Sequence, residues 1–232
     1  MGRKMEWAGR ADHMRGIPRK MVIAAVGACG KAVANLLNST TVHNADTLIR
    51  LVRSRPPGVP LITVSNHMST LDDPVMWGFK GFPIADAKLA RWVLAAEDIC
   101  FKNTIYSYIF RLGKCIPITR GGGIYQEHMN EALDRLSDGE WVMPENYFLG
   151  RRPPFPLCNR NIKIVVGDPI EFDLPKLRQA ALSRSRSLVS PSSGWPTAPS
   201  GLDEAAQRCL YSTISEQIRT VMESLRKILV KH

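Results

Sequence analysis

The chain has 232 residues, of which 44% are apolar and 22% are charged, and this length and composition allow one substantial buried core. They exclude a chain that is disordered over most of its length. Lysine and arginine number 31 against 21 aspartates and glutamates, and the net charge of +10 favours partners with phosphate groups, such as an anionic bilayer or nucleic acid.

The first predicted element is an apolar helix near the N-terminus. Residues 21–30 contain no charged side chain, but Lys31 ends this stretch well short of the roughly 20 residues that a spanning helix needs. Arg19 and Lys20 precede it, and apolar residues continue as far as Leu37. The pattern predicts a helix that lies in a membrane interface or dips into one leaflet, with an ordinary buried helix as the alternative.

From residue 41 onward, short β-rich runs alternate with helical segments, and this alternation predicts an α/β domain. A helix is expected over residues 46–53. Pro117 falls within one predicted strand and places that strand at a sheet edge or bulge, because proline cannot donate a ladder hydrogen bond. The predicted strands cover residues 61–65, 92–95, 115–119 and 162–166.

Two further helices are predicted from apolar side chains that recur every three or four residues. Residues 125–136 carry the first apolar stripe, at Tyr125, Met129, Ala132 and Leu136. Residues 210–229 carry the second, which predicts an amphipathic helix that docks on the core or, as the less favoured alternative, on a membrane. The Ser-Arg-rich and proline-rich residues 183–201 indicate a loop.

The five cysteines are odd in number and widely spaced, and they form no Cys-x-x-Cys pair. Both a disulfide framework and a zinc site need cysteines in matched sets. We therefore expect neither a disulfide framework nor a metal site.

The segment that carries chemistry is 65–74, Ser-Asn-His-Met-Ser-Thr-Leu-Asp-Asp-Pro, between a predicted strand and a helix. The imidazole of His67 can take a proton from an alcohol near neutral pH, since its unperturbed pKa is about 6.5. Asp72 is placed to accept a hydrogen bond from the other ring nitrogen, so the two would act as base and orienter. Capping of the helix by Ser69, Thr70 or Asp72 is the structural alternative.

Asn66-His67 followed by Asp72-Asp73-Pro74 resembles the first signature of the glycerolipid acyltransferase superfamily. The wider wording of residues 60–74 resembles the tafazzins of the plant type in particular. The resemblance implies that His67 and Asp72 are the catalytic pair and that the substrate supplies the nucleophile.

The resemblance covers roughly residues 41–141 and includes a second signature, Gly113 through Arg120. It assigns Arg120 to the phosphate of the acceptor, and Asn66 and Gly113 to substrate binding. A guanidinium beside the glycine turn 121–123 can give two parallel hydrogen bonds to phosphate oxygens, which fits that assignment.

The resemblance is interrupted after Trp141. The family continues into a strand and then Phe-Pro-Glu-Gly, whose glutamate helps to bind the acceptor, whereas Val-Met-Pro-Glu-Asn follows here at 142–146. This is no remnant of the signature, because no phenylalanine precedes the proline and no glycine follows the glutamate. Residues 150–173 match the family further downstream. The hypothesis is an internal deletion near 141/142 of roughly fifty residues, room for two strands and a helix, which would leave unpaired strand edges and weaken both fold and catalysis.

The predicted fold is therefore α/β: a glycerolipid acyltransferase-like sheet flanked by helices and incomplete, with an N-terminal interfacial helix and a C-terminal amphipathic helix. Four parts are expected along the chain. They are a membrane-interface segment (1–40), the acyltransferase-like domain (41–173), a flexible loop (174–201) and the C-terminal helix (202–232).

The function implied by the resemblance is transfer of a fatty acyl group onto a lysophospholipid during phospholipid remodelling, cardiolipin included. Acyl-CoA or another phospholipid would be the donor, without a cofactor, and the acceptor group would be a hydroxyl or a head-group amine. The alternative is a catalytically inactive isoform that binds membrane surfaces. Membrane lipids are the expected partners, with peripheral or monotopic association on an intracellular membrane; the mitochondrial membrane is the expected one, and another internal membrane is the alternative. No nucleic acid is expected, because no recognition motif accompanies the Ser-Arg run.

Overall fold

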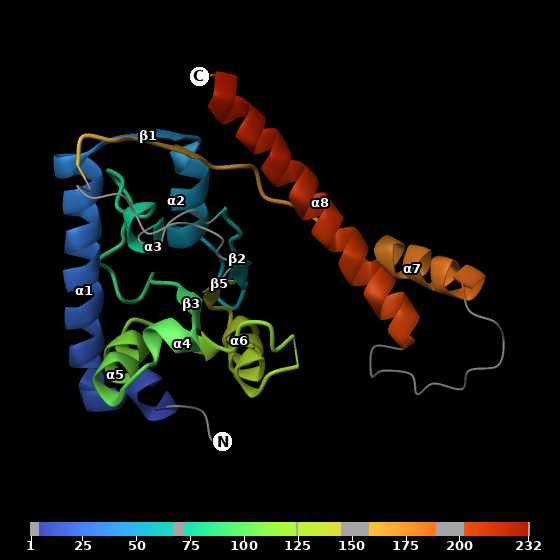
Figure 1. Cartoon of the computed structure of the whole chain (residues 1–232), viewed down its shortest axis with the longest axis horizontal. Coiled ribbons are helices and arrows are strands. Elements are labelled where there is room, and N and C mark those ends of the chain that lie inside the picture. Colours follow the sequence, from blue (N-terminus) through green and yellow to red (C-terminus); the bar gives the residue numbers. More distant parts are fainter. Residues whose placement is uncertain (1–4, 67–71, 124, 145–157, 189–201, 232) are drawn as a thin grey trace. The chain divides into compact units, whose positions relative to one another are not determined.

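The computed structural model describes residues 5–66, 72–123, 125–144, 158–188 and 202–231. By its internal contacts the chain divides into two compact units, Met1–Val166 and Gly167–His232 (Figure 1). The first unit contains parallel sheets flanked by helices, which confirms the predicted fold class.

A four-stranded parallel sheet lies in the first unit, with strand order β2–β5–β3–β4. β4 is an edge strand, as Pro117 predicted. The prediction of a buried strand over residues 61–65 was wrong in length and burial, because β2 has two residues and Ile62 is 57% exposed at the other sheet edge. The strands are β2 (Leu61–Ile62), β3 (Trp92–Ala96), β4 (Cys115–Ile118) and β5 (Trp141–Met143).

Side chains pack against both faces of this sheet. Successive residues of a strand point to opposite faces, and in β5 Trp141 and Met143 join one apolar cluster while Val142 joins another. Helix α2 (Ala45–Arg53), which confirms the predicted helix, contributes Leu48 and Val52 to the first cluster. The other buried members of that cluster are Trp77, Phe79, Phe82 and Ile84.

Helix α6 (Glu127–Ser137) covers the second cluster with Met129, Ala132 and Leu136, as predicted. Tyr125, however, precedes the helix and is 87% exposed, so its place in the apolar stripe was wrong. The helix begins later because Gln126 has an extended backbone and its side chain bonds to the preceding turn.

A separate two-stranded parallel sheet joins β1 (Ser39–His43) to β6 (Asn161–Val165). The strand predicted over residues 162–166 therefore exists, but it pairs outside the main sheet. β1 was not predicted, and the expected boundary at residue 40 falls inside it.

The N-terminal residues form a nearly continuous helical stretch. Two 3₁₀ turns, η1 (Glu6–Gly9) and η2 (His13–Gly16), precede α1 (Ile17–Ala32), and a π-helical turn, η3 (Val33–Leu37), follows it. The helical stretch from His13 to Leu37 has 25 residues and is long and apolar enough, by length and composition, to cross a membrane. The helical stretch continues past Lys31, where the sequence analysis ended the apolar segment. The expectation that this segment is too short to span a membrane was therefore wrong.

Helix α1 packs directly on the segment that follows the sequence motif. A Cβ atom on Gly30 would lie 2.8 Å from the carbonyl oxygen of Pro74, and one on Gly78 would lie 2.2 Å from the carbonyl oxygen of Gly30. Only glycine allows so close an approach of two backbones. The apolar helix and the motif segment therefore share one rigid contact.

Short helices α3 (Asp72–Val75) and α4 (Glu97–Cys100) and the longer α5 (Thr104–Leu112) complete the first unit. α5 and α6 are joined by a fully buried ion pair. Arg111 Nη1 donates to both carboxylate oxygens of Glu131, each at 2.9 Å.

Three cations surround the indole of Trp92, and the carboxylate of Glu140 bonds to both the indole and one of these cations. The charged ends of Arg19, Lys114 and Arg135 lie 5.5, 5.5 and 4.3 Å from the ring centre. Glu140 Oε2 accepts from Trp92 Nε1 at 2.7 Å and from Lys114 Nζ at 2.9 Å. Burial alone would raise the pKa of Glu140, but the charge and hydrogen bond of Lys114, together with the bond from Trp92, outweigh it and lower that pKa.

This shift predicts how Glu140 couples stability to pH. Because its pKa is lower in the folded than in the unfolded chain, its contribution to the free energy of unfolding is present above the unfolded value of about 4.5 and is lost as pH falls through the folded value. Urea unfolding from neutral pH downward should therefore show a smaller acid loss of stability in Glu140→Gln than in the unaltered chain. Parallel curves for the two proteins would contradict the assignment.

The second unit consists of two packed helices, α7 (Leu174–Leu188) and α8 (Glu204–Lys231). α8 confirms the predicted C-terminal helix. The flexible loop predicted from residue 174 onward was wrong over α7, because Asp173 Oδ1 caps the helix by accepting from the backbone N–H of Lys176 at 3.1 Å and an apolar stripe packs on α8. The buried residues of that contact are Ala181, Leu202, Ala206 and Leu210.

Candidate active site

The predicted catalytic motif lies at the carboxyl end of β2. Asn66 is exposed, and α3 begins at Asp72. His67 and the four residues after it lie outside the described residues. The contact between His67 and Asp72 therefore stays a prediction.

The residue after Asp72 has well-defined partners. Asp73 Oδ1 accepts a hydrogen bond from Trp77 Nε1 at 2.8 Å and forms an ion pair with Arg91 Nη2. The guanidinium carbon of Arg91 lies 4.7 Å from the ring centre of Trp77, and the Arg91 side chain is only 11% exposed. Burial lowers the pKa of Arg91 to about 9, and the electrostatic effect of Cys115 acts in the opposite direction.

The segment before the motif is held by β5. Trp141 Nε1 donates to Thr63 Oγ1 at 3.0 Å, and the backbone N–H of Thr63 donates to the carbonyl oxygen of Val142 at 3.3 Å. Trp141 also lies edge-on to Trp77, with ring centres 5.1 Å apart. Both flanks of the motif thus contact the same aromatic pair.

Arg120 lies just beyond the carboxyl end of β4, in an ion pair that the sequence did not predict. Its Nη2 atom donates to both carboxylate oxygens of Asp98, at 3.1 and 3.0 Å, and its Nε atom donates to Asp98 Oδ1 at 3.2 Å. The Arg120 side chain is 31% exposed, so a phosphate can reach it by displacing or joining Asp98.

Gln126 stabilises the glycine turn next to Arg120. Its Oε1 accepts from the backbone N–H of Thr119 at 2.8 Å, and its Nε2 donates to the carbonyl oxygens of Thr119 and Gly123 at 3.0 and 2.6 Å. Gly121 and Gly123 have φ values of +75° and +71°, a conformation that favours glycine. The turn is therefore held in place by side-chain hydrogen bonds.

The sheet places two of the predicted residues at the carboxyl ends of its strands and a third at the amino ends. Parallel strands end at a common edge, where α/β proteins place ligands, and Asn66 and Arg120 both follow strand ends there. β2 and β4 are the outer strands, so these exits lie about 14 Å apart across three strand spacings. Gly113 precedes β4 and therefore lies at the opposite edge, and its role in substrate binding stays a prediction.

Arg120 can be tested independently of the catalytic pair. Arg120→Ala should raise the KM for a phosphate-bearing acceptor roughly tenfold or more, because it removes charge-assisted hydrogen bonds. Arg120→Lys should recover only part of this loss, because an ammonium lacks the fork geometry. Arg219→Ala, which removes an exposed arginine that is likewise bonded to a carboxylate, is the matched control. An unchanged KM in Arg120→Ala would contradict phosphate binding.

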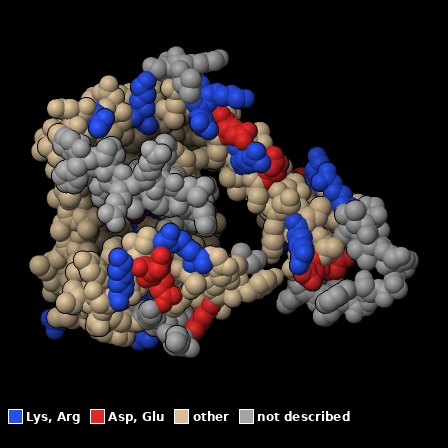
Figure 2. Space-filling model, viewed as in Figure 1, with Lys and Arg blue, Asp and Glu red and all other residues tan. Residues whose placement is uncertain are grey.

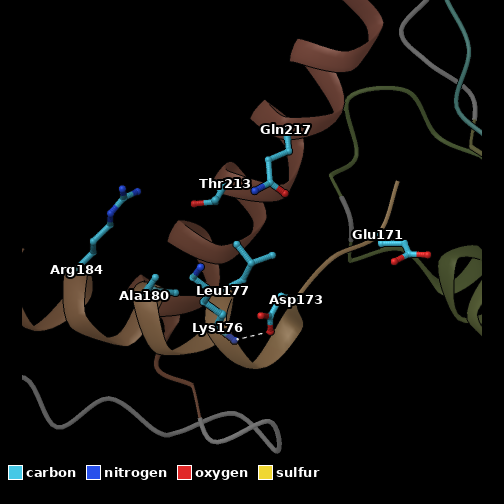
Figure 3. A pocket seen from close by; sticks show the side chains of 9 residues that line it. Glu171, Asp173, Lys176, Leu177, Ala180, Arg184, Thr213 and Gln217 are labelled. Carbon is cyan, nitrogen blue, oxygen red and sulfur yellow. Dashed lines mark hydrogen bonds between the residues drawn. The ribbon is translucent and has the colours of Figure 1, made fainter. Parts of the chain in front are cut away.

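A groove of about 430 Å³ lies between α7 and α8, entirely within the second unit (Figure 3). Asp173 and Lys176 lie at one end of it and Arg184 at the other. None of the predicted site residues lines it. Among the described residues, no group of three or more His, Cys, Asp or Glu side chains could hold a metal ion.

The comparisons with known proteins fit this geometry. A family model described as Acyltransferase matches residues 39–145. The chain is 54% identical to the N-acylphosphatidylethanolamine synthase of Arabidopsis thaliana over 278 positions, which cover 97% of this chain and 98% of the relative. It is 44% identical to tafazzin of Drosophila melanogaster over 124 residues and 44% identical to taffazin of Dictyostelium discoideum over 113. These two alignments cover 53% and 47% of this chain but only 33% and 40% of the relatives.

The alignment with the Arabidopsis synthase also bears on the missing block. Its 278 positions exceed the 232 residues of this chain by 46, so this chain must be gapped against nearly the full length of the relative. That figure is close to the expected fifty, while the position near 141/142 stays a prediction. With this extent of identity, the chain belongs to the acyltransferase family, beside the tafazzins and the plant N-acylphosphatidylethanolamine synthase, and its activity is acyl transfer in phospholipid metabolism.

Proposed function

We propose that the chain moves a fatty acyl group onto a lysophospholipid in phospholipid remodelling. The observation that carries the proposal is the acyltransferase match over residues 39–145, which includes both His67 and Asp72. The placement of Asn66 and Arg120 beyond strand ends at one sheet edge supports it.

In the proposed reaction, His67 takes the proton of the acceptor hydroxyl while Asp72 holds the other ring nitrogen. The acceptor oxygen attacks the acyl carbonyl carbon, and the bond to the leaving group breaks. The proton on His67 then passes to the leaving group, which is the CoA thiol or the hydroxyl of a donor phospholipid. Arg120 holds the acceptor phosphate. No cofactor or metal takes part.

A head-group amine is the second candidate acceptor. The relative that aligns over nearly the whole chain is called N-acylphosphatidylethanolamine synthase, a name that describes acylation of an amine. The same base could serve, because an amine must also lose a proton as the amide forms.

The site is proposed to work at a membrane surface. Several exposed residues of α1 are apolar or small, and charged residues flank them at Lys20 and Lys31. In Figure 2 the side of the molecule along which α1 runs is mostly free of coloured charges between its ends. The contact of Gly30 with Pro74 would hold the motif segment beside that surface. The proposed location is an intracellular membrane. Likeness to the tafazzins favours a mitochondrial membrane, where cardiolipin would be among the remodelled lipids.

The catalytically inactive isoform is the alternative, and the gap of at least 46 positions favours it. Without the lost strands, the chain would bind lipid surfaces but complete no transfer.

The test supplies the purified chain with liposomes that carry labelled acyl-CoA or labelled phospholipid as donor. Lysophosphatidylcholine and phosphatidylethanolamine are the two acceptors. A labelled diacyl product supports the lysophospholipid proposal, and a labelled N-acyl product would transfer the proposal to the amine. Liposome flotation of the chain and of His67→Ala is run in parallel. Binding without either product would overturn the catalytic proposal and leave the surface-binding isoform.

A further inference from the structure

A buried arginine connects to the catalytic motif without being part of it. Arg91 precedes β3, is 11% exposed and pairs with Asp73, the residue after the proposed orienting carboxylate. Its Nε atom is buried without a hydrogen-bond partner. The Asp73 side chain is 30% exposed, and a partly exposed ion pair adds little stability, so stability alone does not account for the pairing.

The surroundings of Arg91 tie both flanks of the motif together. On one flank, Asp73 accepts from Arg91 and Trp77. On the other, Trp141 donates to Thr63 at 3.0 Å. The guanidinium lies 4.7 Å from the ring centre of Trp77 and 5.9 Å from that of Trp141, so a single cation contacts both aromatic anchors.

Two adjacent carboxylates create a chemical problem that Arg91 solves. An imidazole can be oriented by either neighbour, and an uncompensated Asp73 would compete with Asp72 for the ring N–H of His67. Asp73 Oδ1 is instead engaged by Trp77 Nε1 and Arg91 Nη2. The other group that acts electrostatically on Arg91 among the described residues is the thiol of Cys115, on β4.

We propose that Arg91 is a positioning residue for acyl transfer. It neutralises Asp73 and fixes the C-terminal flank of the motif, so that Asp72 alone orients His67. This inference rests on the proposed function and adds a residue to its site.

The decisive readout is the pKa of His67, measured by NMR titration of its ring C–H and assigned with His67→Ala. Arg91→Met keeps the apolar stem and leaves Asp73 uncompensated, so the His67 pKa should rise by about one pH unit. Asp73→Asn in the same chain should return it towards the original value. Asp73→Asn alone should lower it, because an unpaired cation remains; this single variant keeps the test open if Arg91→Met fails to fold.

Activity gives the second readout. Arg91→Met should lower kcat about 100-fold, as expected from a small misplacement of a base. The acidic limb of its kcat/KM profile should move to higher pH, and adding Asp73→Asn should partly reverse that move. An unchanged His67 pKa in both single variants would overturn the role of Arg91. An inactive unaltered chain whose His67 pKa shifts as stated would instead overturn the proposed function and leave the positioning role standing.

Discussion

Acyl transfer by His67→Ala should be slower than by the unaltered chain by roughly 10²- to 10⁴-fold in kcat, because the variant lacks the proposed general base. The KM for the acceptor should change little, since the proposal assigns the phosphate to Arg120 and not to the imidazole. Steady-state rates with labelled donor and increasing lysophospholipid measure both parameters. Loss of the proton acceptor should also flatten the acidic limb of the pH–rate profile.

His43→Ala is the matched control for this measurement. It removes an imidazole at the end of β1, outside the four-stranded sheet and the motif, and should keep the original rate. Flotation on anionic liposomes compares lipid binding by both variants with that of the unaltered chain. A His67→Ala protein that turns over as fast as His43→Ala would show that another group deprotonates the acceptor.

Local patterns predicted the elements whose formation depends on nearby residues. The apolar run that follows the proline and glycine residues at 56–58 corresponds to β2, although that strand is shorter than predicted. The stripe through Met129 and Leu136 corresponds to α6, and the C-terminal stripe corresponds to α8. Pro117 even placed β4 at the sheet edge, because a missing N–H is a local property. Tyr125 failed because Gln126 bonds to the turn before it, and that contact was not visible in the spacing.

Elements that depend on distant partners could not be predicted in this way. β1 lacks an apolar run and exists because Ser39–His43 pairs with a strand more than 100 residues later. α7 looked like a loop because its serines and arginines hide a narrow apolar stripe, which becomes stable only by packing on α8.

The candidate site shows the same division. The resemblance to two short family signatures pointed to His67, Asp72 and Arg120, because each signature is a continuous stretch of sequence. The ion pairs of Asp98 and Arg91 were not predicted, although both residues lie in segments that resemble the family. Their partners come from other strands and helices, and no periodicity in one sequence reveals such pairings.

Glu131→Leu should destabilise the first unit by about 3–5 kcal/mol, because it leaves the guanidinium of Arg111 buried without its carboxylate. The two side chains are 0% and 1% exposed, so water cannot replace the lost partner. Urea unfolding followed by tryptophan fluorescence measures the change. Arg135, whose Nη2 lies 3.8 Å from Glu131, stays partly exposed and stacked on Trp92 and should add little to the loss.

The double variant Arg111→Met with Glu131→Leu distinguishes an ionic cause from a packing cause. If the cost comes from an uncompensated charge, removing that charge as well should recover most of the lost free energy of unfolding, since apolar pairs of similar volume replace buried ion pairs with little penalty. Glu223→Ala, which breaks the exposed pair with Arg219 on α8, should have only a small effect. A double variant as unstable as Glu131→Leu alone would attribute the loss to packing between α5 and α6, and α6 would then depend on shape and not on charge for its place over the sheet.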